Sequence, residues 1–330
     1  MVKRLFAFIL SILLLLSGCS MGNFCLHEYK SVVTESAYAF REGTMTYTCQ
    51  KCEHSYTETI PATAKLKLLM IGNSFSEDAS SYLWKICKEG KDFLEDVTVA
   101  VAYIGASTLD DHWNNIQNNT ASYEYQKNTD GNLVRTPGKT LSDIVEDEQW
   151  DVIAVQQQST LNSSAESLSH LNDIIDWVKW YQPQAQVYYH MTWAHSSTST
   201  DAKFLAACGG DRDKFHGSVV EVVQNEVIPN KQICGVIASG TLIQNLSYSY
   251  LGEGPLYRDT LHLSNSYGRY AVALLWYAYV LGGDINQIDW VPKLVEGMDE
   301  DLPLIREAVQ NALTDPFVIT ACETEKPTAP

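Results

Sequence analysis

The sequence predicts a three-layer α/β/α domain with a parallel sheet, preceded by a small β-rich module. From about residue 65 onward, short apolar runs alternate with segments whose apolar residues recur at helical spacing. Such alternation is typical of parallel strands joined by right-handed helical crossovers. Residues 20–64 differ, because they are rich in Thr, Tyr and Ser and alternate in the way short strands do. The 45% hydrophobic and 11% aromatic content suffices for a buried core.

The predicted elements follow from these runs. Five runs are predicted strands, namely residues 67–71, 97–102, 151–155, 186–192 and 233–238. Helices are predicted over 78–90, 165–181, 214–228 and 265–281, with a further helix ending near 148. The main domain is expected to span residues 65–320, with a tail over 321–330. In such sheets the ligand site lies at the carboxyl ends of the strands.

One segment interrupts the alternation. Tyr123–Asn128 and Asn132–Arg135 flank Thr129-Asp130-Gly131, which predicts a β-hairpin with a glycine turn. We expect this hairpin to be an insertion over the domain surface, either as a plain loop or as a lid with aromatic contacts.

The N-terminus carries a targeting pattern. Lys3 and Arg4 precede the apolar run 5–16, which is short for a membrane span. The following Leu16-Ser17-Gly18-Cys19 resembles a bacterial lipobox. We therefore predict a signal peptide over residues 1–19, a lipid on Cys19, and a location on the outer face of the cell membrane. The alternative is an ordinary signal peptide with a cysteine there by chance.

The formal net charge of −17 limits the class of partner. Nucleic acid is disfavoured, because phosphate binding needs clustered Lys and Arg. A neutral substrate meets no such repulsion. Alternatively, the acidic surface only keeps the protein soluble.

Three cysteines and a histidine cluster in the N-terminal module. Cys25 and His27 form a Cys-x-His pattern, and Cys49 and Cys52 form Cys-x-x-Cys between two predicted strands. Four such ligands suit a tetrahedral structural Zn²⁺ site, which would leave no open position for chemistry. A Cys49–Cys52 or Cys25–Cys49 disulfide, or neither arrangement, is the alternative. The segment also resembles a short repeat of Gram-positive surface proteins, over about 38 residues.

Residues with catalytic chemistry stand where predicted strands end. Ser74 follows the first strand and precedes a helix, whose positive end favours an oxyanion product. Gly105 follows the second strand, and Gln156-Gln157-Gln158-Ser159 follows the third. Asp259 lies three residues before His262, so its carboxylate can turn back and accept the imidazole Nδ1–H.

The order Ser, Gly, amide and Asp-x-x-His resembles the SGNH (GDSL-like) hydrolase superfamily over residues 66–282. The resemblance implies a flavodoxin-like sheet, Ser74 as nucleophile, His262 as base and Asp259 as its orienter. It also implies an oxyanion hole made by Ser74, Gly105 and an amide of the third block. Strand phase favours Gln157 as that amide, with Gln158 next. The first block reads Gly-Asn-Ser rather than Gly-Asp-Ser, and the third lacks its usual Gly-x-Asn-Asp.

This resemblance implies an extracellular serine esterase that needs no cofactor for catalysis and removes O-acetyl groups from carbohydrate. Trp193, after the fourth strand, would either stack on a sugar ring or belong to the core. The alternative function is a non-catalytic carbohydrate-binding surface lipoprotein with the same fold. A dinucleotide-binding domain is disfavoured, since no Gly-x-Gly-x-x-Gly follows the first strand.

Overall fold

A computed structural model describes residues 25–90 and 93–327. The chain forms two compact units, of which the smaller comprises residues up to 32 and 45–58. The predicted β-rich module contains a three-stranded sheet of β1 (Tyr29–Glu35), β2 (Gly43–Cys49) and β3 (Ser55–Ile60). The predicted signal peptide and Cys19 lie outside the described residues.

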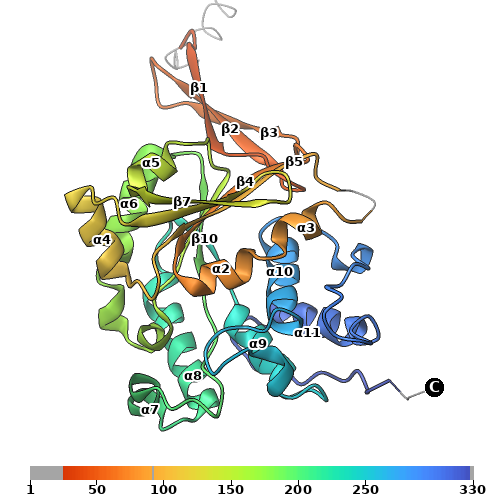
Figure 1. Ribbon diagram of the computed structural model, residues 1–330. Coiled ribbons are helices and arrows are strands. Elements are labelled where there is room, and N and C mark those ends of the chain that lie inside the picture. Colours follow the sequence, from red (N-terminus) through yellow and green to blue (C-terminus); the bar gives the residue numbers. More distant parts are fainter. Residues whose placement is uncertain (1–24, 91–92, 328–330) are drawn as a thin grey trace, which may run out of the picture. The chain divides into compact units, whose positions relative to one another are not determined.

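The larger unit is built on a seven-stranded sheet with the order β10-β9-β8-β4-β5-β6-β7 (Figure 1). Its strands are β4 (Lys65–Gly72), β5 (Asp96–Tyr103), β6 (Tyr123–Asn128), β7 (Leu133–Lys139), β8 (Val152–Val155), β9 (Gln186–His190) and β10 (Ile233–Ile237). β4, β5, β8, β9 and β10 are parallel, as predicted. Numbered along the chain, these five strands have the flavodoxin-like order 2-1-3-4-5. The direction of winding therefore reverses between β4 and β8, where such sheets bind their ligands.

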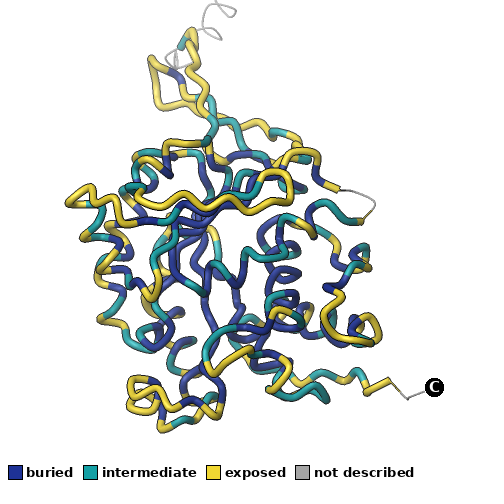
Figure 2. Tube along the Cα trace, in the orientation of Figure 1, coloured by how far each residue is buried: buried dark blue, intermediate teal, exposed yellow. Residues whose placement is uncertain are grey.

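Two layers of helices cover the sheet, as the strand sequences require. Along β4, Leu66, Leu68 and Met70 pack on one face, whereas Leu69 and Ile71 pack on the other. This alternation buries both faces of the strand, and the central strands β4, β5, β8 and β9 are buried over most of their length (Figure 2).

The helices divide between the two faces. On the first face lie α2 (Ser74–Ser80), α3 (Leu83–Cys87), α9 (Ser239–Ser247), α10 (Tyr267–Tyr279) and α11 (Leu302–Thr314). On the second lie α4 (Leu109–Asn118), α5 (Leu141–Val145), α6 (Leu171–Tyr181), α7 (Ala202–Cys208) and α8 (Arg212–Val222). The predicted three-layer α/β/α class is confirmed.

The hairpin between β5 and β8 differs from the expectation. β6 pairs antiparallel with β5, and β7 pairs antiparallel with β6, so the hairpin extends the sheet instead of lying over its surface. The Tyr123 and Tyr125 side chains are buried in the core. The hairpin is therefore a structural edge and neither a plain loop nor a lid.

The boundary between the units also differs from the expected division near residue 64. Residues 33–44 belong to the larger unit. Tyr38 is fully buried there, with its hydroxyl 3.2 Å from the Tyr188 hydroxyl and donating to the Val280 carbonyl. Sequence composition could not reveal this, because the segment has the same Thr- and Tyr-rich character as its neighbours.

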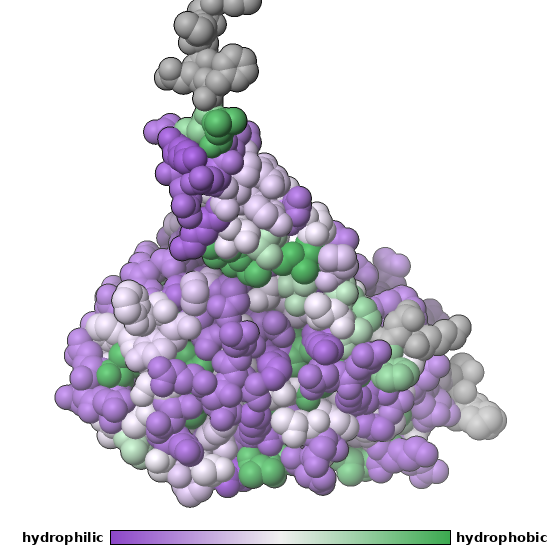
Figure 3. All heavy atoms as spheres, turned by 90° about the horizontal axis from the view of Figure 1, so that it is seen from above, coloured by the Kyte–Doolittle hydropathy of each residue, from purple (hydrophilic) through white to green (hydrophobic). Residues whose placement is uncertain are grey.

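The face in Figure 3 is mostly hydrophilic, with hydrophobic residues in small separate areas. Across residues 25–90 and 93–327, the structure contains no helix with the length and apolarity that crossing a membrane requires.

Candidate active site

Ser74 is the first residue of α2, directly after β4. The Asn73 side chain caps this helix, since its Oδ1 accepts the Phe75 N–H at 3.0 Å. Gly72 permits the sharp entry, because a Cβ there would lie 2.4 Å from Ser76 Oγ. The Ser74 N–H lies in the first turn, where helix amides have no intrahelical acceptor. The turn therefore presents a hydroxyl and an amide donor at the end of the strand.

The loop before α10 brings a histidine and a carboxylate to this hydroxyl. His262 Nε2 lies 2.9 Å from Ser74 Oγ, and His262 Nδ1 lies 2.8 Å from Asp259 Oδ2. A carboxylate can only accept, so Nδ1–H donates to Asp259 and Nε2 accepts from Ser74. The other carboxylate oxygen accepts the backbone N–H groups of Leu261 and His262, both at 2.7 Å. The structure thus brings together the three residues predicted to form the catalytic relay.

The same contacts set the charge state of Asp259. Partial burial by itself raises the pKa of this carboxyl, but hydrogen bonds from the backbone and side chain of His262 and from the Leu261 N–H lower it more. The pKa therefore lies below its usual value, and Asp259 is ionised at neutral pH. An ionised Asp259 can stabilise the imidazolium that forms when His262 takes the serine proton.

A hollow of about 280 Å³ opens in front of Ser74 and His262. Phe75, Tyr103, Gly105, Ala106, Gln158, Ser159 and Leu261 are among its lining residues. Gly105 thus lies where the sequence placed it, in the turn after β5. The next residue, Ala106, has a left-handed φ of 57°. For a residue other than Gly this conformation is uncommon, and it clusters at functional sites.

The structure does not support Gln157 as an oxyanion donor. Its Nε2 donates to the Ser167 carbonyl at 2.6 Å, and its Oε1 accepts the Leu109 N–H at 3.2 Å, on the α4 side of the sheet. Gln158 lines the hollow instead. Its Oε1 is occupied by the Thr160 N–H at 3.1 Å, whereas its Nε2 makes only a long contact of 3.4 Å to Ser159 Oγ. Gln158 is therefore the third-block amide available to a ligand.

Trp193 belongs to the core, and the structure does not support sugar stacking on it. It is fully buried and stacks on Phe75, with ring centroids 4.2 Å apart. Its indole N–H donates to the Leu261 carbonyl at 3.0 Å. The ring has no surface left for a ligand, but it supports both the nucleophile helix and the His262 loop.

Sequence reasoning missed a buried ion cluster that joins the same two segments. Asp78 of α2 is fully buried, and its Oδ1 accepts from Arg258 at 2.8 Å and from Arg269 Nε at 2.9 Å. Its Oδ2 accepts the Leu263 N–H at 2.8 Å. The helix that carries Ser74 is thereby tied to the loop that carries His262. No local signal reveals this, since the partners lie 180–191 positions apart.

A second serine–histidine pair also stands near the hollow. Ser159 Oγ lies 3.1 Å from His195 Nε2, and His195 Nδ1 lies 3.2 Å from Ser199 Oγ. His195 is 3% exposed and stacks on Phe204 with centroids 4.8 Å apart. Burial lowers the pKa of His195, which disfavours its charged form.

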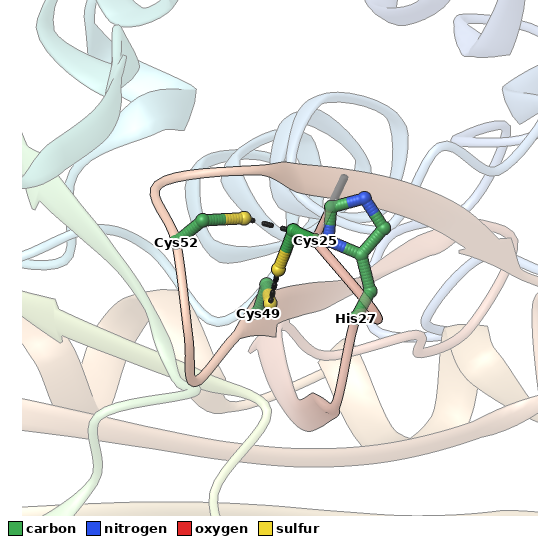
Figure 4. Close-up of side chains that lie close together, drawn as sticks. All are labelled: Cys25, His27, Cys49 and Cys52. Atoms are coloured by element: carbon green, nitrogen blue, oxygen red, sulfur yellow. Dashed lines mark hydrogen bonds between the residues drawn. The ribbon is translucent and has the colours of Figure 1, made fainter. Parts of the chain in front are cut away.

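The predicted metal ligands of the smaller unit also lie together. One ligand atom from each of Cys25, His27, Cys49 and Cys52 lies within 4.8 Å of all the others (Figure 4). Cys25 and His27 precede β1, Cys49 ends β2, and Cys52 lies in the turn before β3.

Comparison with known proteins gives a family but no activity. A family model described as "Domain of unknown function (DUF4886)" matches residues 67–312. The crystal structure of a DUF4886 family protein from Bacteroides uniformis is 28% identical, with a TM-score of 0.72, and the match covers 78% of this chain and 97% of that one. A protein from Slackia heliotrinireducens, provisionally assigned to the SGNH hydrolases, is 19% identical with a TM-score of 0.41, covering 64% of this chain and 96% of that one. No curated protein matches the sequence.

Proposed function

This chain belongs to the DUF4886 family, and from that premise we propose that it is a serine esterase that cleaves short acyl groups, with Ser74 as the nucleophile. The observation that carries the proposal is the continuous relay from Ser74 through His262 to Asp259, with contacts of 2.9 and 2.8 Å. A hydroxyl, a base and an orienting carboxylate in this order are the parts that acyl transfer requires.

The reaction proceeds in two steps. Ser74 Oγ attacks the ester carbonyl as His262 Nε2 takes its proton, and the same imidazole then protonates the departing alcohol. This leaves the acyl group on Ser74. Water, deprotonated by His262, attacks the acyl-enzyme, and the products are a carboxylic acid and free Ser74. Asp259 stabilises the imidazolium in both steps.

Three donors face the position of the developing oxyanion in this proposal. They are the N–H of Ser74, the N–H of Gly105 and the Nε2 of Gln158, whose residues all line the hollow. Loss of one such donor lowers the rate by about 10²–10³-fold in related chemistry. Gln158 thus takes the role that sequence analysis gave to Gln157.

The proposed substrate is an O-acetylated carbohydrate outside the cell. The hollow of about 280 Å³ suits a short acyl group, and the net charge of −17 favours a neutral polymer over an anionic one. The extracellular location rests on the signal-peptide pattern and on the lipobox ending at Cys19. Metabolic labelling with a radioactive fatty acid, lost on Cys19→Ala substitution, tests the lipid anchor.

The central test compares wild type with Ser74→Ala on p-nitrophenyl acetate. We expect acetate release by wild type and covalent capture of Ser74 by a fluorophosphonate, with both lost in the variant. Equal rates for the two proteins contradict the proposal. A series of p-nitrophenyl esters of increasing chain length, followed by an acetylated and a deacetylated polysaccharide, then tests the acyl group and the carbohydrate.

A further inference from the structure

We propose that Cys25, His27, Cys49 and Cys52 bind one structural Zn²⁺ ion. The four residues come from two separate stretches of chain, yet their side chains point toward one another (Figure 4). A backbone hydrogen bond holds the two stretches next to each other, because the Gln50 N–H donates to the Glu28 carbonyl at 2.8 Å. The cluster lies entirely within the smaller unit and does not involve the esterase site.

The spacing between ligand atoms fits a tetrahedral zinc centre. With bonds of about 2.3 Å to sulfur and about 2.0 Å to nitrogen, two sulfurs lie about 3.8 Å apart and a sulfur and a nitrogen about 3.5 Å apart. Cys25 Sγ and Cys49 Sγ are 3.7 Å apart. Cys52 Sγ and His27 Nδ1 are 3.4 Å apart. Three thiolates and an imidazole are a ligand set that Zn²⁺ favours.

Surrounding groups support the ligands in the way metal sites require. The Lys51 N–H points at Cys49 Sγ from 3.4 Å, a contact that stabilises a thiolate. The His27 ring packs on Tyr29 and His54, with centroids 5.4 and 4.7 Å away. The Tyr29 hydroxyl is in turn 2.8 Å from His54 Nδ1. The imidazole ligand is thus held in place by packing.

The smaller unit also needs a source of stability other than a core. Among its described residues, 25–32 and 45–58, Cys49 alone is buried. Such a small sheet without apolar burial is marginal in water, and metal binding is a common way to stabilise it. With all four positions filled by protein ligands, the ion has no open site for a substrate. Its role is therefore structural.

The test uses the full chain, purified without chelator and measured by mass spectrometry for metal content. We expect about one zinc per chain in wild type and near-complete loss in Cys25→Ser and Cys52→Ser. Cys234→Ser and Cys322→Ser are matched controls that should keep the metal, since both cysteines lie outside the cluster. Replacement of zinc by Co²⁺ should give the absorption bands of a tetrahedral thiolate site in wild type and controls only.

Three further measurements make the result decisive. Circular dichroism of the variants should show an intact larger unit, while chelator treatment should speed proteolysis within residues 25–32 and 45–58 alone. Mass analysis under non-reducing conditions should find Cys25, Cys49 and Cys52 without disulfides. Absence of zinc together with a disulfide among Cys25, Cys49 and Cys52, or retention of zinc by Cys25→Ser, overturns the proposal. Neither outcome depends on esterase activity, so the two proposals fail separately.

Discussion

Two serine–histidine pairs border the same hollow, and their hydroxyl–imidazole distances differ little, at 2.9 Å for Ser74–His262 and 3.1 Å for Ser159–His195. The groups that contact the other ring nitrogen of each histidine differ more. His262 donates to the Asp259 carboxylate, whereas His195 contacts the Ser199 hydroxyl. A hydroxyl cannot stabilise an imidazolium as a carboxylate does.

The exposure of the two histidines to solvent also favours Ser74–His262 as the reactive pair. The His262 side chain is 24% exposed, while His195 is 3% exposed and its pKa is lowered by burial. A histidine that resists protonation is a poor acceptor for a serine proton. Under the proposed function, the hydroxyl–imidazole distance therefore does not distinguish the two serines, whereas the group that holds each imidazole does.

Replacing each of the two serines by alanine should produce the largest difference in esterase activity between two variants. Ser74→Ala should lower kcat/KM for p-nitrophenyl acetate by at least about 10³-fold, because Ser74 is the hydroxyl whose histidine partner is held by a carboxylate. Ser159→Ala, which removes the same atom from the other pair, should stay within about threefold of wild type. Fluorophosphonate labelling of the two variants checks the assignment. Labelling of Ser159 in wild type would contradict it.

Loss of the carboxylate charge should have the next largest effect. Asp259→Asn keeps the shape but removes the charge, so kcat should fall by about 10²–10⁴-fold with KM nearly unchanged. Because the pKa of Asp259 is below its usual value, Asp259 should stay ionised in wild type at mildly acidic pH. A pH–rate profile that falls with the titration of a carboxyl near pH 5 would contradict this state.

Disrupting the buried ion cluster of Asp78 with Arg258 and Arg269 should lower activity by an intermediate amount. Asp78→Asn leaves Arg258 and Arg269 without their buried partner, so the free energy of unfolding should fall by about 3 kcal/mol. We also expect kcat to fall about tenfold, because the His262 loop loses its tie to α2.

The control for this prediction is Asp151→Asn, which alters a half-buried carboxyl at the opposite end of β8. It should leave kcat and the rate of fluorophosphonate labelling unchanged. Urea unfolding and labelling rates separate the two roles of Asp78. If labelling by Asp78→Asn at a temperature where it is fully folded equals that of wild type, Asp78 serves stability alone.

Substitution of His195 should have the smallest effect on activity and stability. His195 has a lowered pKa when folded, so the unfolded chain binds protons more readily and the folded state loses stability as the pH falls below about 6.5. His195→Gln should therefore lose less stability than wild type between pH 7 and 5, with kcat within about twofold at pH 7. Thermal unfolding across this range measures the difference, and identical pH slopes would contradict it.

The sequence was sufficient for the five parallel strands and for the three residues of the proposed relay. The parallel strands have apolar residues on both faces, which reveals them locally. Ser74, Asp259 and His262 stand next to strand or helix ends, but their assignment also needed the order of motifs that resembles the SGNH superfamily. Gln157 was placed incorrectly because β8 ends at Val155, and strand phase does not continue through the turn that follows.

Other features of the site are set by contacts between residues that are distant in sequence, so no local pattern predicts them. The burial of Trp193 in the core depends on its packing against Phe75. The structural role of Asp78 likewise depends on its contacts with Arg258 and Arg269. The hairpin was recognisable from its turn, but its place at the sheet edge was set by pairing with β5. The sequence thus located the proposed catalytic groups better than the groups that hold them in place.

The distance along the chain between Ser74 and His262, 188 positions, has a consequence for biosynthesis. During translation the serine emerges long before its histidine. Until the last third of the polypeptide has been made and has folded back onto the first, the hydroxyl has no proton acceptor. In the proposed mechanism, a chain that ends before His262 is therefore expected to be inert toward esters, and reactivity should arise only with the completed fold.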